Sequence, residues 1–211
     1  AKHEPVPMPA GWTFAVAVSG VLAEKTGAAL ESYNNVSLRV AELVDAWNLR
    51  YGTDCLTFAE VLNQSEAAAE ELGQLLVDDP ELAKRPDLME RLLAYLVEVG
   101  EVIPTAEAAL KVGDVEAFGS IVDLSHRNAD ENLHNQIEET NALQRIAREL
   151  GAGAASAFGA GFGGSVWALI PEEGAQEWAD AWLETYLEQF PENRAGASVL
   201  ITKAGSPAQR I

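Results

Sequence analysis

The sequence predicts an α+β protein in which a ferredoxin-like βαββαβ layer carries a large helical insertion in its first crossover. Two observations support this fold class. Short apolar runs rich in β-branched and aromatic residues are typical of strands, and they occupy residues 12–19, 154–158, 166–170 and 197–202. The long segment between the first two runs instead repeats its apolar residues at intervals of three and four, which is typical of helices with one buried face.

Helix signals divide the insertion into several segments. Ser32 is a candidate N-cap for a helix that ends near Tyr51, and Thr57 and Glu60 have the spacing of a capping box for a helix that reaches Val77. Further helices are expected at residues 86–112 with a kink or restart at Pro104, from Val115 towards His126, around residues 143–150, and in the second crossover at residues 172–190.

Composition limits the classes of partner and compartment. The 211 residues include 14 basic and 33 acidic side chains, so the formal net charge is 14 − 33 = −19. A surface this acidic disfavours binding to nucleic acid and to anionic membranes. A single cysteine, Cys55, excludes an intrachain disulfide and suits a reducing compartment, and the sequence holds no apolar run of membrane-spanning length. We therefore expect a cytoplasmic protein.

The chain is predicted to be one domain with short flanking segments. Pro5, Pro7 and Pro9 indicate that residues 1–11 are a linker from a preceding N-terminal domain. Residues 12–203 are expected to form the domain body, and residues 204–211 a loose tail.

The most informative stretch is a glycine-rich segment between two predicted strands. Gly159, Gly161, Gly163 and Gly164 fall within A-F-G-A-G-F-G-G-S-V-W-A-L-I-P. Glycines permit positive φ and close approach of other groups, so one hypothesis is a loop near bound phosphate. The alternative is a hairpin connection without a ligand. A dinucleotide fingerprint is rejected, because a β-branched and aromatic run, and no helix, follows the last glycine.

No other motif completes a catalytic or metal site. Ser165 lacks the frame of a nucleophile elbow, and His3, His126 and His134 have no partners at metal-ligand spacing. His126 is interpreted as a helix-end or core residue. Adjacent carboxylates are expected to be solvated, given the acidic composition. The residues alone assign neither a catalytic group nor a metal ligand.

Four stretches, in order, resemble the C-terminal half of galactokinase-like members of the GHMP kinases. The glycine-rich segment is similar to the third conserved motif of these small-molecule kinases. Residues 14–34, which end in S-Y-N, are similar to the family segment ending in S-x-Y-N. Residues 91–123 are similar to its helical R-x-x-H-x-x-x-E region, and Ser125-His126 to the S-H pair before the last motif.

The resemblance implies roles for particular residues. Tyr33 matches the tyrosine that touches the sugar, and Gly159, Gly161, Gly163 and Gly164 match a loop that supports the ATP-binding loop of the other half. ATP and Mg²⁺ would be bound mainly by an N-terminal domain outside these residues, which also supplies the catalytic aspartate. The resemblance therefore implies a sugar 1-kinase acting on galactose or a related sugar, with this chain inactive alone and open to self-association through the face its partner domain would cover.

The sequence also departs from the family pattern. Asn35-Val36-Ser37 follow Tyr33-Asn34 where the family has x-R-R, so both arginines are missing. Ala94 stands where the family's histidine is expected, and Ser165 replaces a cysteine. These changes leave the identity of the sugar open. They also leave open an alternative to the kinase, namely a non-catalytic binding or interaction module that retains the fold.

Overall fold

The computed structural model describes residues 6–23 and 28–205, with the backbone alone for residues 28–36. The chain divides into two compact units, which are described separately. The sheet unit comprises residues 1–23, 102–127 and 135–211, and the helical unit comprises residues 24–101 and 128–134. The predicted domain boundaries stay a prediction.

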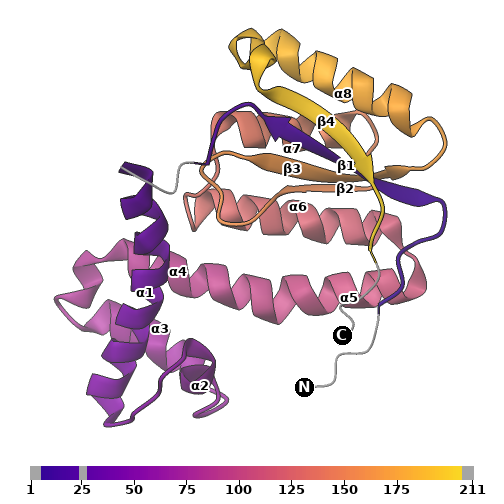
Figure 1. Cartoon of the computed structure of the whole chain (residues 1–211). Helices are drawn as coiled ribbons and strands as arrows, with labels where there is room; N and C mark the ends of the chain where they lie inside the picture. The colour runs from indigo at the N-terminus through magenta and orange to yellow at the C-terminus, as the bar shows by residue number, and fades with distance from the viewer. Residues whose placement is uncertain (1–5, 24–27, 206–211) are drawn as a thin grey trace, which may run out of the picture. The chain divides into compact units, whose positions relative to one another are not determined.

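Four antiparallel strands form the sheet of the first unit (Figure 1). They are β1 (Trp12–Ser19), β2 (Ala154–Ala157), β3 (Ser165–Pro171) and β4 (Ala197–Thr202), in the spatial order β2-β3-β1-β4. Ala15 of the central strand β1 lies opposite Ala168 of β3 and Ile201 of β4. This is the order and direction of a ferredoxin-like βαββαβ layer, so the predicted fold class is confirmed.

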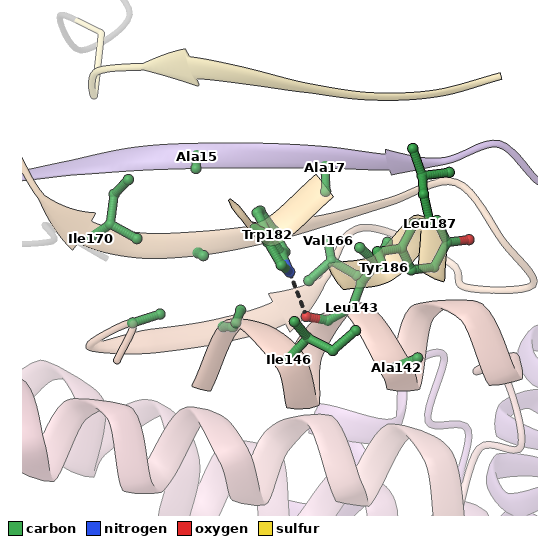
Figure 2. Packing of buried hydrophobic residues seen from close by; sticks show 14 residues of the cluster. Ala15, Ala17, Ala142, Leu143, Ile146, Val166, Ile170, Trp182, Tyr186 and Leu187 are labelled. Carbon is green, nitrogen blue, oxygen red and sulfur yellow. Dashed lines mark hydrogen bonds between the residues drawn. The ribbon is translucent and has the colours of Figure 1, made fainter. Parts of the chain in front are cut away.

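Helices α7 (Glu138–Glu149) and α8 (Ala175–Gln189) cover one face of the sheet. Figure 2 shows the core between them, where Trp182 of α8 is fully buried and its Nε1–H donates to the Leu143 carbonyl at 2.9 Å. The small residues Ala15 and Ala17 of β1 leave room for this ring and for Tyr186. Val122 of helix α6 (Val115–Glu131) packs with Ala154 and Leu169 in a second cluster.

The helical unit has its own core. It contains α1 (Ala28–Tyr51), α2 (Phe58–Leu62), α3 (Ala68–Asp78), the short turn η1 (Leu82–Lys84) and α4 (Pro86–Val97). The core is formed by apolar side chains from α1 to α4, including Leu43, Trp47, Phe58, Leu72, Leu88 and Leu92. The π-helical turn η2 (Glu98–Val102) separates α4 from α5 (Ile103–Val112), which confirms the expected restart near Pro104.

Two helix boundaries differ from the sequence prediction. Ser32 is not an N-cap, because α1 begins at Ala28; alanine and leucine at positions 28–30 are good helix formers and extend the first turn. The helix expected to run from Thr57 to Val77 is broken into α2 and α3 at the polar segment 63–67, whose side chains compete for backbone hydrogen bonds. The Thr57–Glu60 capping box itself is confirmed, with Oγ1 of Thr57 accepting from the Glu60 amide at 3.2 Å.

In the described part of the chain, no helix combines the length and the apolar character needed to cross a membrane.

Candidate functional site: a glycine loop held on both flanks

Residues 158–164, here called the glycine loop, connect β2 to β3. Its four glycines have positive φ angles of 63°, 81°, 120° and 84° at Gly159, Gly161, Gly163 and Gly164. Phe162 also lies in the left-handed region, at φ 60°, which is uncommon for a bulky residue. A run of such angles needs support from the surrounding structure, and the glycine loop is supported on each side.

Asn135 holds the loop on one flank. Its backbone carbonyl accepts from the Phe162 amide at 2.5 Å, and its side-chain Nδ2 donates to the Ala160 carbonyl at 3.1 Å. A Cβ at Gly161 would stand only 1.9 Å from the Asn135 carbonyl oxygen. Glycine at position 161 is therefore required by close approach as well as by its backbone angle.

The segment after β1 holds the other flank. The Gly164 amide donates to the Val21 carbonyl at 2.9 Å, and the Gly164 carbonyl accepts from the Ser19 amide at 2.8 Å. A Cβ at Gly163 would lie 3.0 Å from the same Val21 oxygen. The Ser19 hydroxyl accepts from the Val21 amide at 3.1 Å and so fixes the turn that leaves the sheet.

These contacts separate the inner part of the loop from its tip. The amides of Phe162 and Gly164 donate to protein carbonyls and are already used, so they are not free to bind an anion. Gly159 is exposed, and no atom lies within 4 Å of the place where its Cβ would stand. A second backbone or an anionic group could therefore come close at the tip, which is what the hypothesis of a loop near bound phosphate requires.

A buried histidine fixes the strand that enters the loop. His126 of α6 is 5% exposed, and its Nδ1 accepts from the Ala157 amide at 3.4 Å. The other ring nitrogen, Nε2, then carries the proton and donates to Oδ1 of Asn141 at 3.0 Å. The interpretation of His126 as a core residue is confirmed.

A polar network buries the end of β1 behind the loop. The hydroxyl of Tyr186 donates to the Ser19 carbonyl at 2.7 Å and accepts from Nδ2 of Asn193 at 2.9 Å. Burial raises the pKa of Tyr186 to about 12, although the Asn193 hydrogen bond acts in the opposite direction. The hydroxyl therefore stays protonated and keeps donating to Ser19 at neutral pH.

The structure describes only some of the side chains that the sequence analysis singled out in the helical unit. Tyr33 lies in α1, but its side chain is outside the described residues. Ala94 is 3% exposed, and its carbonyl accepts from Nδ2 of Asn128 at 2.9 Å. Nε of Arg91 is buried without a hydrogen-bond partner in the described part of the chain, and burial lowers the pKa of this guanidinium.

Asn135 and the network of Tyr186 were missed by sequence reasoning. Asn135 lies in N-L-H-N-Q, a polar segment between two helices that carries no motif, and its contact with the loop spans 25 positions of sequence. Among the described residues, no group of three or more histidine, cysteine or acidic side chains could hold a metal ion.

Comparison with known proteins finds relatives for part of the chain. Residues 106–188 match the family described as GHMP kinases C terminal. The chain is 39% identical to a galactokinase of Thermococcus kodakarensis over 116 residues, which cover 54% of this chain and 33% of that protein. It is 37% identical to a galactokinase of Pyrococcus furiosus over 100 residues, which cover 47% of this chain and 28% of that protein. These matches thus span a third or less of the relatives' length.

Structural comparison extends the likeness to almost the whole chain. A crystal structure of Lactococcus lactis galactokinase in complex with galactose superposes with a TM-score of 0.75 at 20% identity, covering 98% of this chain and 48% of that one. At this identity the match supports the fold. The chain is therefore similar in sequence to the GHMP kinases C terminal family over residues 106–188 and to galactokinases over about half of its length, and it is similar in fold to a galactokinase over almost its whole length.

Proposed function

We propose that this chain is the C-terminal part of an ATP-dependent sugar 1-kinase of the galactokinase type. The complete protein would transfer the γ-phosphoryl group of ATP to the anomeric hydroxyl of galactose or a related sugar. The observation that carries the proposal is the 39% identity to a galactokinase over about half of the chain, in a chain whose glycine loop joins two strands of the sheet.

In this proposal the chain supplies one wall of the site. The glycine loop offers an open tip at Gly159 and an inner part fixed by Asn135 and Val21, which suits a rigid support for a phosphate-binding loop on an N-terminal domain. Tyr33 is the proposed sugar contact. Phosphoryl transfer depends on positioning and on neutralising phosphate charge, so a wall that cannot shift contributes even without touching the reacting atoms.

The described residues form no ready-made Mg²⁺ site, because they hold no group of three or more histidine, cysteine or acidic side chains that could hold a metal ion. The amides of Phe162 and Gly164, which could otherwise donate to phosphate oxygens, donate to protein carbonyls. The proposal therefore assigns Mg²⁺, most ATP contacts and the catalytic base to the N-terminal domain, and it predicts that the 211-residue chain is inactive alone.

One assay tests the proposal. The complete gene product is incubated with ATP and a panel of hexoses, ADP release is followed in a coupled assay, and the 211-residue chain is assayed in parallel. We expect sugar-dependent turnover by the complete protein and none by the chain. Turnover by the chain alone would contradict the assignment of the catalytic groups to another domain.

A second candidate is a non-catalytic binding module that keeps the fold. Two departures favour it: the family arginines after Tyr33-Asn34 are absent, and position 94, where the family has a histidine, is an alanine that is only 3% exposed. If the complete protein binds a sugar, measured by calorimetry, but releases no ADP with any hexose, this candidate replaces the kinase.

A further inference from the structure

The strongest unassigned feature is the contact between Asn135 and the glycine loop. Asn135 is 5% exposed, so its polar groups are shielded from water and must find partners in the protein. Its carbonyl accepts from the Phe162 amide, its Nδ2 donates to the Ala160 carbonyl, and its Oδ1 accepts from Nε2 of Gln136 at 2.9 Å. Asn135 therefore makes two hydrogen bonds to the loop, one as donor and one as acceptor.

The two contacts bracket Gly161. Ala160 and Phe162 are its neighbours, and the absence of a side chain at position 161 lets the Asn135 carbonyl reach the loop. Phe162 has a φ of 60°, a conformation that costs about 1–2 kcal/mol in a residue with a side chain unless neighbours enforce it. The hydrogen bond from the Phe162 amide to Asn135 is placed where it stabilises this conformation.

Given the proposed kinase function, on which this inference rests, we propose that Asn135 is a positioning residue for nucleotide binding. It holds Ala160–Phe162 in the conformation in which the glycine loop supports the phosphate-binding loop of the N-terminal domain. It acts through the loop and does not itself touch substrate. The residue belongs to the segment between α6 and α7, which thereby becomes part of the functional site.

Asn135→Asp is the sharpest test, because aspartate keeps the size and the oxygen but loses the Nδ2–H donor. A carboxylate oxygen would face the Ala160 carbonyl, and the hydrogen bond from position 135 to this carbonyl would be lost. Asn128→Asp is the matched control. Asn128 is also 5% exposed and also donates Nδ2 to a backbone carbonyl, that of Ala94 at 2.9 Å, but it lies in the helical unit.

The first measurement is amide hydrogen exchange in the 211-residue chain. With Asn135→Asp we expect the Phe162 amide to exchange roughly tenfold faster or more, because an opening worth about 1.4 kcal/mol corresponds to a factor of ten. The Gly164 amide, bonded to Val21 on the opposite flank, should change by less than about threefold. Equal acceleration at both amides, or none at either, would overturn the proposal.

The second measurement uses the complete protein. We expect Asn135→Asp and Asn135→Ala to lower kcat/KM for ATP roughly 10- to 100-fold while the sugar dissociation constant stays within about twofold. Asn128→Asp should lower thermal stability comparably and leave both kinetic constants of the folded enzyme unchanged. Loss of sugar and ATP affinity in parallel, or an equal effect in the control, would mean that Asn135 acts only on stability.

The two measurements separate this proposal from the one on which it rests. If the wild-type complete protein shows no turnover with any hexose, the kinase function is wrong, and the exchange experiment still decides whether Asn135 sets the loop. If turnover is present and ATP kinetics are unchanged by Asn135→Asp, the kinase function stands and the role of Asn135 is refuted.

Discussion

The sheet unit and the helical unit differ in how completely their buried polar groups are hydrogen-bonded. In the sheet unit, the buried side chains of Thr13, Ser19, His126 and Asn135 all have hydrogen-bond partners. In the described part of the helical unit, two buried donors have none, and these are Trp47 Nε1 and Arg91 Nε. An unsatisfied buried donor costs about 1–3 kcal/mol, so the two units should respond differently to substitution.

The difference indicates where geometry is fixed. The satisfied groups of the sheet unit gather around the glycine loop and the ends of β1 and β2, so changing one of them leaves a partner unpaired. The helical unit relies on an apolar core and on partly exposed ion pairs such as Arg39–Asp87 at 3.0 Å, which contribute less than about 1 kcal/mol each. Four predictions test this contrast.

The largest effect is expected within the glycine loop. Gly161→Ala should lower the free energy of unfolding by roughly 2–5 kcal/mol, because a Cβ would meet the Asn135 oxygen and the φ of 81° disfavours alanine. Gly159→Ala is the control: its φ is 63°, but the space is open, so we expect about 1 kcal/mol. Urea unfolding followed by circular dichroism measures both. Equal costs would mean that the Asn135 contact does not constrain the loop.

Two buried tryptophans test the contrast between units directly. Trp182→Phe removes the donor to the Leu143 carbonyl and should cost about 2–4 kcal/mol, while Trp47→Phe removes a donor without a partner and should cost about 1–2 kcal/mol. Both rings are at most 2% exposed, so the loss of apolar area is similar. Unfolding midpoints in urea give the difference. If Trp47→Phe proves the more costly, the contrast fails.

The parts of the structure that the sequence predicted are those with local causes. The strands of the sheet follow from apolar runs such as residues 12–19, and the Thr57–Glu60 cap follows from its spacing. The glycine loop was found because glycines are informative on their own. Asn135 could not be found, because its role depends on a contact across 25 positions that no pattern in its own segment encodes. The start of α1 was misplaced because the good helix formers at positions 28–30 extend the helix beyond the candidate cap.

The third prediction concerns the hydroxyl of Tyr186. Tyr186→Phe should cost about 1–2 kcal/mol at neutral pH, because it leaves the Ser19 carbonyl without this donor. The control is Tyr95→Phe in the helical unit, whose hydroxyl has no hydrogen-bond partner among the described residues and whose removal should be close to neutral. Urea unfolding at pH 7 compares the two variants.

The same tyrosine predicts a pH dependence. The pKa of Tyr186 is raised from 10.0 to about 12 in the folded protein. The unfolded chain therefore loses this proton first, and the stabilisation is complete below pH 10 and is lost as pH rises towards 12. The wild-type protein should lose more stability than Tyr186→Phe over this interval. Parallel stability curves would show that the hydroxyl is not buried as described.

The smallest effect is expected at Arg91. Burial and the like charge of Arg39 lower the pKa of its guanidinium, and its Nε has no hydrogen-bond partner in the part of the chain that the structure describes, so its charge opposes folding. Arg91→Met keeps the aliphatic stem and should change the free energy of unfolding by between zero and about 1 kcal/mol in the stabilising direction. Arg39→Met, which breaks the ion pair with Asp87, should instead destabilise by up to about 1 kcal/mol.

A stabilised Arg91→Met variant would also test whether the unsatisfied buried group of the helical unit is kept for function. A residue that lowers stability and is nevertheless present is commonly retained for function. We therefore expect this variant to be as stable as the wild type or more so, while its activity in the complete protein falls. Thermal unfolding and the coupled ATP assay on one preparation measure both. Unchanged activity would assign Arg91 no role in the site, and destabilisation by more than about 2 kcal/mol would show that its guanidinium has a partner after all.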